Sequence, residues 1–368
     1  MNKEITGQFL GHIEGTNQGH IVFNLEYENG ELRGSLRVRD ANEAMPSFVT
    51  DISAKLIANS FSFEGTNIRA IDPLSYTEMT NTDFTHSYPE ITFPQIISGS
   101  GKFSNGEIEG AWQTDISTKG NFSVRTYYGP ATETTSSVLQ WSAFRERLTQ
   151  FSSDSFIFRG QGSNKWGLRT KFHRSGRSNL LRYFKEDVPK LYRLVHAETG
   201  LKFDLNCNED LGALLYLAQH HGYPTPLLDW SCSPYVAAYF AFRDVDETAE
   251  EYARIYVLDK SRWGADTYQT EQYRTHEMTI SYSELLASGN KRAIPQQAVT
   301  TFSTVDWIEG YFAHKSKSGE VQYLTSFDIA VSEKNTVLEE LRQMGITEAS
   351  LFPGLDGICK DLSSRYFA

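Results

Sequence analysis

The chain has 368 residues, 39% of them hydrophobic and 22% charged, which is an ordinary globular composition and enough for about two domains. Its formal net charge of −11 argues against broad, nonspecific nucleic-acid binding, although a local basic groove is compatible with it. No apolar run reaches the length of about 18 residues that a membrane span needs, and residues 1–15 lack the apolar core of a secretory signal. The three cysteines are widely separated and form no CxxC pair. We therefore expect a cytoplasmic protein with reduced thiols and no membrane contact.

The first third of the sequence shows the alternation of apolar and polar residues that is typical of β-strands. Two alternating runs flank Asn29-Gly30, a pair that suits a tight hairpin turn with positive φ. The same pattern flanks Asn105-Gly106. Residues 1–128 are therefore predicted to form an antiparallel β-domain, either a sandwich or barrel-like, in which residues 70–95 form a long loop.

A polar segment containing Gly and Pro, residues 129–137, predicts a linker at a domain boundary. Residues 138–151 then show the apolar spacing of a helix, with Ser137 as its expected N-cap. Strands and helices alternate after that, and no internal repeat stands out. Residues 138–368 are therefore predicted to form an α+β domain.

The segment Phe158-Arg159-Gly160-Gln161 ends an apolar strand with a cation and a glycine. An arginine at the end of a buried strand needs an anionic partner, because an unpaired buried charge costs several kcal/mol. That partner is either a structural carboxylate or a ligand phosphate, which a planar guanidinium grips well. In the second case Gly160 would let the backbone approach a ligand.

Residues 222–242 read GYPTPLLDWSCSPYVAAYFAF and place Asp229, Ser231 and Ser233 between a predicted strand and a predicted helix. Ser233 suits the N-cap of that helix, a role worth about 1 kcal/mol. Capping accounts for one serine only. Strand ends that face a helix N-terminus also bind phosphates and sugars, so this turn is a candidate binding site.

Two further pairs of polar residues stand at predicted element ends. His220 and His221 are adjacent in a helix and point about 100° apart, so a shared metal ion is disfavoured and a polar helix end is the expected role. Gln296 and Gln297 precede a predicted strand. They are either surface residues or hydrogen-bond partners of a ligand.

Together these segments resemble the FRG domain family, named for its Phe-Arg-Gly motif. The family pattern is an FRGQ strand, a helix ending in QHxG, PTxLLDWxxSPxxAxxFA, a QQ strand and LFPxLDGI. The matching segments are FRGQ at 158–161, QHHG at 219–222, PTPLLDW and its continuation at 224–242, QQ at 296–297 and LFPGLDGI at 351–358. The resemblance covers about residues 138–362. The chain departs from the pattern at Pro226, where the family usually has Arg, and at Ala298, where Gly is usual.

The order of the motifs is similar to that of the ADP-ribosyltransferase fold, a split β-sheet with helices. That resemblance implies NAD as co-substrate and catalytic roles for Arg159, Ser231 and Gln297. Cofactor contacts are implied for Arg159, Gly160, Gln161, Asp229, Ser231, Ser233 and Tyr235, and no metal is implied. Gln297 stands where the fold supplies a catalytic Glu, and Gln carries no negative charge to stabilise an oxocarbenium-like ribose. Asp229 and Glu277 are alternative acids.

Three functions stay open at this point. The first is an ADP-ribosyltransferase-like effector that modifies an unknown protein or nucleic acid, with a bacterial toxin or phage-defence role implied by the family resemblance. The second is a catalytically degenerate module that binds a nucleotide or a protein. The third, a metal-dependent hydrolase using His220, His221 and Asp229, is weakest because the ligand spacing is wrong. The first two require Arg159 and the hydroxyls of Ser231 and Ser233 to converge on one cavity.

Overall fold

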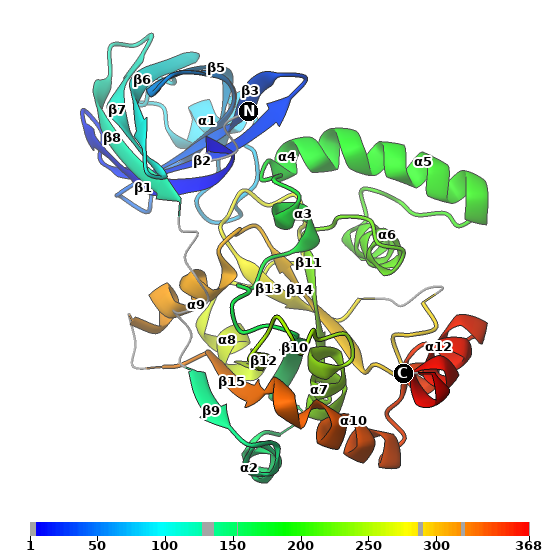
Figure 1. The fold of residues 1–368 in the computed structure, drawn as a ribbon. Helices are drawn as coiled ribbons and strands as arrows, with labels where there is room; N and C mark the ends of the chain where they lie inside the picture. The colour runs from blue at the N-terminus through cyan, green and yellow to red at the C-terminus, as the bar shows by residue number, and fades with distance from the viewer. Residues whose placement is uncertain (1–4, 127–135, 153, 286–289, 318–320, 368) are drawn as a thin grey trace. The chain divides into compact units, whose positions relative to one another are not determined.

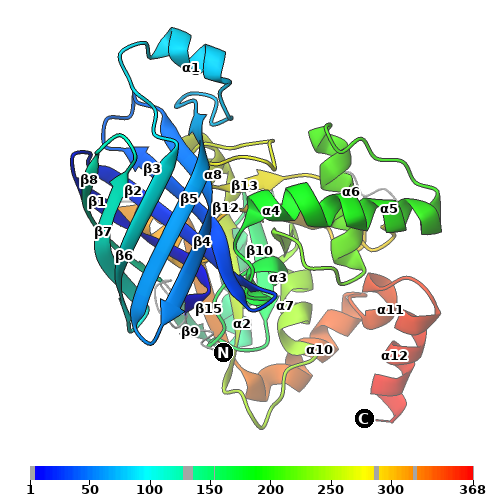
Figure 2. The same ribbon diagram turned by 90° about the horizontal axis from the view of Figure 1, so that it is seen from above.

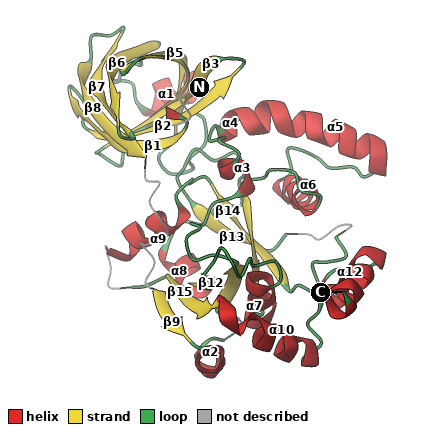
Figure 3. Ribbon diagram, in the orientation of Figure 1, coloured by secondary structure: helices red, strands yellow, loops and turns green. Residues whose placement is uncertain are grey.

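The computed structural model describes residues 5–126, 136–152, 154–285, 290–317 and 321–367. The chain divides into two compact units, which Figures 1 and 3 show by chain position and by secondary structure. Unit 1 comprises residues 1–128, 172–202 and 274–278, and unit 2 comprises residues 129–171, 203–273 and 279–368. The division differs from the expected domains because residues 172–202 and 274–278 associate with the β-domain.

Unit 1 is built on a closed eight-stranded barrel, the barrel-like alternative of the sequence prediction. Each strand pairs antiparallel with the next, and β1 pairs with β8. The strands are β1 (Gly7–Gly15), β2 (Gly19–Glu28), β3 (Glu31–Asp40), β4 (Ser47–Ile57), β5 (Ser60–Ile71), β6 (Ile96–Ser104), β7 (Glu107–Thr114) and β8 (Lys119–Thr126). The two Asn-Gly turns form as expected, since Asn29, Gly30, Asn105 and Gly106 all have positive φ.

The segment predicted as a long loop, residues 70–95, contains helix α1 (Asn81–Ser87). Thr80 is its N-cap, and its side-chain oxygen accepts a hydrogen bond from the backbone N–H of Asp83 at 3.1 Å. Phe84 on this helix packs edge-on against Phe93, with ring centroids 4.9 Å apart. The helix was missed because seven residues are too few to show a clear helical period.

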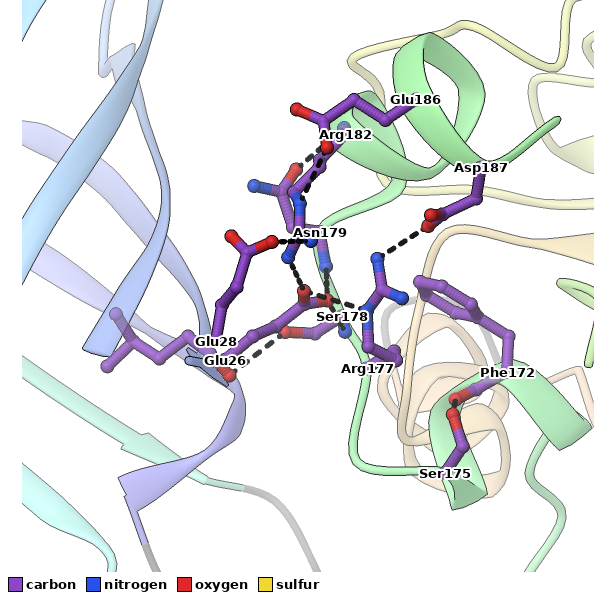
Figure 4. Close-up of polar contacts among 11 residues, drawn as sticks. Glu26, Glu28, Phe172, Ser175, Arg177, Ser178, Asn179, Arg182, Glu186 and Asp187 are labelled. Carbon is purple, nitrogen blue, oxygen red and sulfur yellow. Dashed lines mark hydrogen bonds and ion pairs between the residues drawn. The ribbon is translucent and has the colours of Figure 1, made fainter. Parts of the chain in front are cut away.

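Residues 172–202 belong to unit 1 because they satisfy a buried carboxylate on the outside of the barrel. Leu25 of β2 faces the barrel core, so the next residue, Glu26, points outward. Its carboxylate accepts hydrogen bonds from the backbone N–H groups of Ser178 and Asn179, both at 2.7 Å, and from Arg177 Nε at 2.8 Å (Figure 4). A buried charge is tolerated when it is paired and hydrogen-bonded in this way. The segment contains most of α3 (Lys171–Arg174), then α4 (Leu180–Arg182), the π-helical turn η3 (Tyr183–Asp187) and α5 (Val188–Thr199).

Unit 2 contains a seven-stranded sheet in the order β13-β14-β11-β10-β12-β15-β9, and it is antiparallel except for the pair β15 and β9. The strands are β9 (Ser136–Leu139), β10 (Phe156–Gln161), β11 (Leu227–Ser231), β12 (Tyr252–Asp259), β13 (Ile280–Ser283), β14 (Ala298–Ser303) and β15 (Leu324–Ala330). The helices are α2 (Trp141–Arg147), η2 (Leu148–Gln150), α6 (Asn208–His220), α7 (Pro234–Phe242), α8 (Lys260–Asp266), α9 (Ile308–Lys317), η4 (Val331–Glu333), α10 (Lys334–Gln343), α11 (Glu348–Leu351) and α12 (Leu355–Tyr366). Unit 2 is thus a mixed α/β region.

The predicted linker and the helix after it are only partly as expected. Residues 129–135 of the linker lie outside the described residues. Residues 136–139 form β9, which pairs in parallel with β15, and the helix begins at Trp141 rather than at residue 138. The prediction of a helix over residues 138–151 was wrong at its start because β15 offers its edge to this segment, a tertiary contact that local apolar spacing does not report.

Candidate functional site

The three strands that carry the sequence motifs lie side by side in the order β14-β11-β10. Within the described sheet, β10 and β11 are joined by the single residue pair Phe158 and Ser231, so the sheet is split at this position. Arg159 bridges the split, because its Nη1 donates to the backbone carbonyl oxygen of Asp229 at 2.6 Å. At the split, no backbone N–H of β10 pairs with the carbonyl of Asp229. The hydrogen bond from Arg159 satisfies this carbonyl instead.

Arg159 and Ser231 do not point to the same face of the sheet. Residues directly opposite each other in an antiparallel pair share a face, so the side chains of Phe158 and Ser231 lie on one side and that of Arg159 on the other. Phe158 packs in the apolar core with α7, the helix that Ser233 caps. The expected convergence of Arg159 with Ser231 and Ser233 on one cavity is therefore wrong, since the pleat separates them.

The two serine hydroxyls hold the turn between β11 and α7. Ser231 Oγ donates to the carbonyl oxygen of Gln296 at 2.8 Å and accepts from the backbone N–H of Ser233 at 3.0 Å. Ser233 Oγ accepts from the N–H of Val236 at 3.3 Å, as expected of an N-cap. Both serines are buried, and these hydrogen bonds are internal to the chain.

The two glutamines are also tied to other motifs. Gln297 lies just before β14 with a φ of 46°, and its carbonyl accepts from the N–H of Cys232 at 2.9 Å. The side chain of Gln296 donates from Nε2 to the carbonyl oxygen of Leu351 at 2.9 Å. The QQ motif therefore joins the serine turn to the LFPGLDGI segment.

Asp229, the carboxylate of the PTPLLDW motif, is exposed. Its Oδ1 accepts a hydrogen bond from Gln219 Nε2, and Gln219 Oε1 accepts in turn from the hydroxyl of Thr225. Gln219 belongs to the QHHG motif and Thr225 to PTPLLDW. The amide of Gln219 thus fixes the orientation of the Asp229 carboxylate.

Two side chains of α6, those of Tyr216 and His220, have shifted pKa values. Burial, together with the negative charge of Asp229, raises the pKa of Tyr216 to about 12. Burial also lowers the pKa of His220, and the positive charge of Arg292 and the neighbouring His221 lower it further. Sequence reasoning missed Tyr216 and Arg292 because neither belongs to a motif that suggests ligand binding.

The other residues predicted to contact a cofactor, Gly160, Gln161 and Tyr235, contact other parts of the chain. Gly160 lies against α7, where a Cβ atom would lie 1.9 Å from the carbonyl oxygen of Ala237. Gln161 Nε2 donates to the carbonyl of Trp166 at 3.0 Å. Tyr235 packs edge-on against Trp141, with centroids 6.5 Å apart. The close approach expected at Gly160 is thus occupied by a helix, whereas ligand contacts of Gln161 and Tyr235 stay predictions.

The two alternative sites suggested by the sequence, at Glu277 and at His220-His221, have other surroundings than expected. Glu277 belongs to unit 1, where its carboxylate pairs with Arg37 at 2.6 Å and with Arg39 at 3.7 Å. The rings of His220 and His221 stand at 89° to each other with centroids 5.1 Å apart. Among the described residues, no group of three or more His, Cys, Asp or Glu side chains is placed to hold a metal ion.

The site therefore lies in a mixed α/β unit whose motif residues hydrogen-bond across three adjacent strands. Residues 154–250 match the FRG domain family, and the chain is an FRG-domain protein. The crystal structure of Rv2717c from M. tuberculosis is similar over 33% of this chain and 93% of that chain, with 7% sequence identity and a TM-score of 0.21. No curated protein matches the chain. In the part of the chain that the structure describes, no helix is both long and apolar enough to cross a membrane.

Proposed function

We propose that the FRG domain binds a nucleotide, with NAD as the first candidate, at the split between β10 and β11. The observation that carries this proposal is that the Arg159 guanidinium reaches the backbone carbonyl of Asp229 at the split, while the exposed Asp229 carboxylate, on the Ser231 side of the sheet, is oriented by Gln219. A guanidinium recognises phosphate oxygens, and a carboxylate beside a strand end accepts hydrogen bonds from ribose hydroxyls. A bound phosphate would compete for the bond that Arg159 now donates to the Asp229 carbonyl.

We propose binding without group transfer as the main function. Gln297 carries no charge with which to stabilise an oxocarbenium-like sugar. The hydroxyl hydrogen of Ser231 is donated to Gln296, and Ser233 caps α7. The serines that the ADP-ribosyltransferase resemblance assigns to the ribose therefore support the fold of the turn.

ADP-ribosyl transfer to a macromolecule is the second candidate, favoured by the adjacency of β14, β11 and β10. In that reaction the bond from nicotinamide to its ribose breaks, a nucleophile of the target bonds to the same ribose carbon, and nicotinamide leaves. Asp229 is the motif acid available for it. A role in toxicity or phage defence rests on the family resemblance alone.

Calorimetry of the full chain with NAD and with ADP-ribose tests the proposal. Asp229→Asn keeps an oxygen for Gln219 but removes the charge, and we expect it to weaken binding at least about tenfold. Glu146→Gln, at an exposed position of α2 outside the motifs, is the matched control and should bind as the wild type does. Absence of NAD and ADP-ribose binding by the wild type would contradict the proposal. Release of nicotinamide with ADP-ribosylation of a target would instead support the second candidate.

A further inference from the structure

One end of the barrel in unit 1 contains a cavity of about 140 Å³ that is partly open to solvent. Its walls come from the ends of the strands that meet there. The principal apolar side chains of the wall are Ile13, Ile21, Leu36, Val38, Ile97 and Trp112. Most of these side chains are buried, so the cavity extends into the core of the barrel.

The opposite part of the barrel interior is filled. Phe23 contacts three other rings, those of Phe61, Phe63 and Phe122, with centroids 5.1–5.9 Å apart. Phe9 and Phe103 pack edge-on at 6.3 Å. An eight-stranded barrel has room either for side chains or for one small ligand, and this barrel combines a packed part with an open one.

The cavity end is covered by the segment that contains α1, which Figure 2 shows at one end of the barrel. Ile91, Thr92 and Pro94 of this segment contribute to the cavity lining. Between them, Phe93 packs on Phe48 of β4 and on Phe84 of α1, in both cases with centroids 4.9 Å apart. The aromatic contacts hold the cover on the barrel.

Four polar residues of the lining, Thr50, Thr114, Thr118 and Asp40, have partners within the chain. Thr50 Oγ1 donates to the carbonyl oxygen of Thr66 at 2.7 Å, and the hydroxyls of Thr114 and Thr118 lie 2.6 Å apart. Asp40 accepts from the backbone N–H of Asn42 at 2.8 Å. Lys, Arg and His do not occur among the residues described as lining the cavity. An anionic ligand such as a fatty acid would therefore find no cation to pair with its charge.

From this lining and this volume, we infer that the barrel binds a neutral, apolar molecule about the size of one aromatic ring. A dry apolar cavity of about 150 Å³ in another protein accommodates benzene, which sets the scale. Burial of the ligand's apolar surface supplies the affinity. A carboxylate analogue of the ligand, such as benzoate, should not bind, because the described lining offers no cation to pair with its charge. This site is independent of the proposed nucleotide site, because it lies entirely in unit 1.

Fluorine NMR of the full-length protein with fluorobenzene tests the inference. We expect line broadening that excess benzene reverses and that an equal concentration of benzoate does not reverse. Val38→Phe places a ring in the cavity and should weaken fluorobenzene binding about tenfold or more. Val138→Phe makes the same change at an exposed position of β9 and should leave binding unchanged.

Three results would overturn the inference: no saturable broadening with the wild type, competition by benzoate as strong as that by benzene, or unchanged binding in a folded Val38→Phe protein. If Val38→Phe does not fold, the variant Ile68→Ala tests the inference instead, because it enlarges the same cavity. The enlarged cavity should bind naphthalene more tightly than the wild type does, and a failure to gain naphthalene binding in the folded variant would count against the site.

Discussion

Gly160 of β10 lies directly against the carbonyl oxygen of Ala237 in α7, so that a Cβ atom at position 160 would be 1.9 Å from that oxygen and 2.7 Å from the nitrogen of Ala241. Contacts with backbone atoms cannot be relieved by a side-chain rotation. The glycine of the Phe-Arg-Gly motif therefore allows a helix to pack closely on the strand. The arginine next to it faces the opposite side of the sheet, toward the split.

Gly160→Ala should consequently destabilise unit 2. Relief of the clash requires α7 to move away from β10, and overpacking of this kind costs about 1–3 kcal/mol or more. Gly264→Ala in α8 is the matched control, because a Cβ atom there meets no atom within 4 Å. We expect the control to be neutral or to stabilise by about 0.5–1 kcal/mol, since alanine favours helices. Urea unfolding compares the two, and equal stability of both variants would contradict the packing role.

Glu26→Gln should destabilise unit 1. The carboxylate is 2% exposed and pairs with Arg177 and Arg182. Glutamine retains one oxygen for the backbone donors of Ser178 and Asn179. Arg177 keeps Asp187 as a partner, and Arg182 keeps Glu28 and Glu186, so the substitution removes only their hydrogen bonds to a charged group. We therefore expect a cost of about 1–3 kcal/mol. The exposed carboxylate of Glu14 gives the control variant Glu14→Gln, for which thermal unfolding should show almost no change.

The features that the sequence predicts well are those encoded locally. Asn29-Gly30 and Asn105-Gly106 locate two turns of the barrel, and Ser233 before Pro234 locates the start of α7. The relation between Arg159 and Ser231 could not be predicted in this way, because it depends on which residue of β10 stands opposite Ser231. A shift of one residue in that register would turn the arginine to the other face.

Long-range contacts explain the other differences. β9 forms because β15 accepts a parallel partner, and residues 172–202 join unit 1 because Glu26 needs donors. Neither contact can be predicted from the residues near 136–139 or 172–202, because the partner of each segment is distant in the sequence. The FRGQ, QHHG and PTPLLDW motifs, in contrast, could be recognised because each is short and specific, and they lie within residues 154–250, which match the FRG domain. The QQ and LFPGLDGI motifs lie outside the matched residues.

The ion pair of Arg254 and Asp328 predicts a pH dependence of stability. Burial alone would raise the pKa of Asp328, but hydrogen bonds from Arg254 and Asn164, together with the charge of Arg254, hold that pKa below its usual value. An aspartate whose pKa is lower in the folded state contributes stability above its unfolded pKa of about 3.9. That contribution is lost as the pH falls through the folded pKa.

The wild type should therefore be more stable than Asp328→Asn at neutral pH, and the difference should shrink as the pH falls below about 4. This difference in stability is measured from the melting temperatures of both proteins at a series of pH values from 7 to below about 4. Glu146→Gln, at an exposed position of α2, serves as the control for a general effect of losing one carboxylate. A difference that stays constant with pH would show that Asp328 acts through packing rather than through its charge.

Ser231→Ala and Ser233→Ala separate structural support from ligand contact at the turn before α7. Loss of the Ser233 cap should cost about 1 kcal/mol. Loss of the Ser231 hydroxyl leaves both the Gln296 carbonyl and the Ser233 N–H without that partner, which should cost about 1–3 kcal/mol. Because both hydroxyls are used inside the chain, neither substitution should change the affinity for NAD while the protein is folded. Calorimetry at a temperature well below each melting point measures this affinity. A loss of NAD binding in folded Ser233→Ala, comparable with that of Asp229→Asn, would mean that the cap hydroxyl turns toward the nucleotide when it binds.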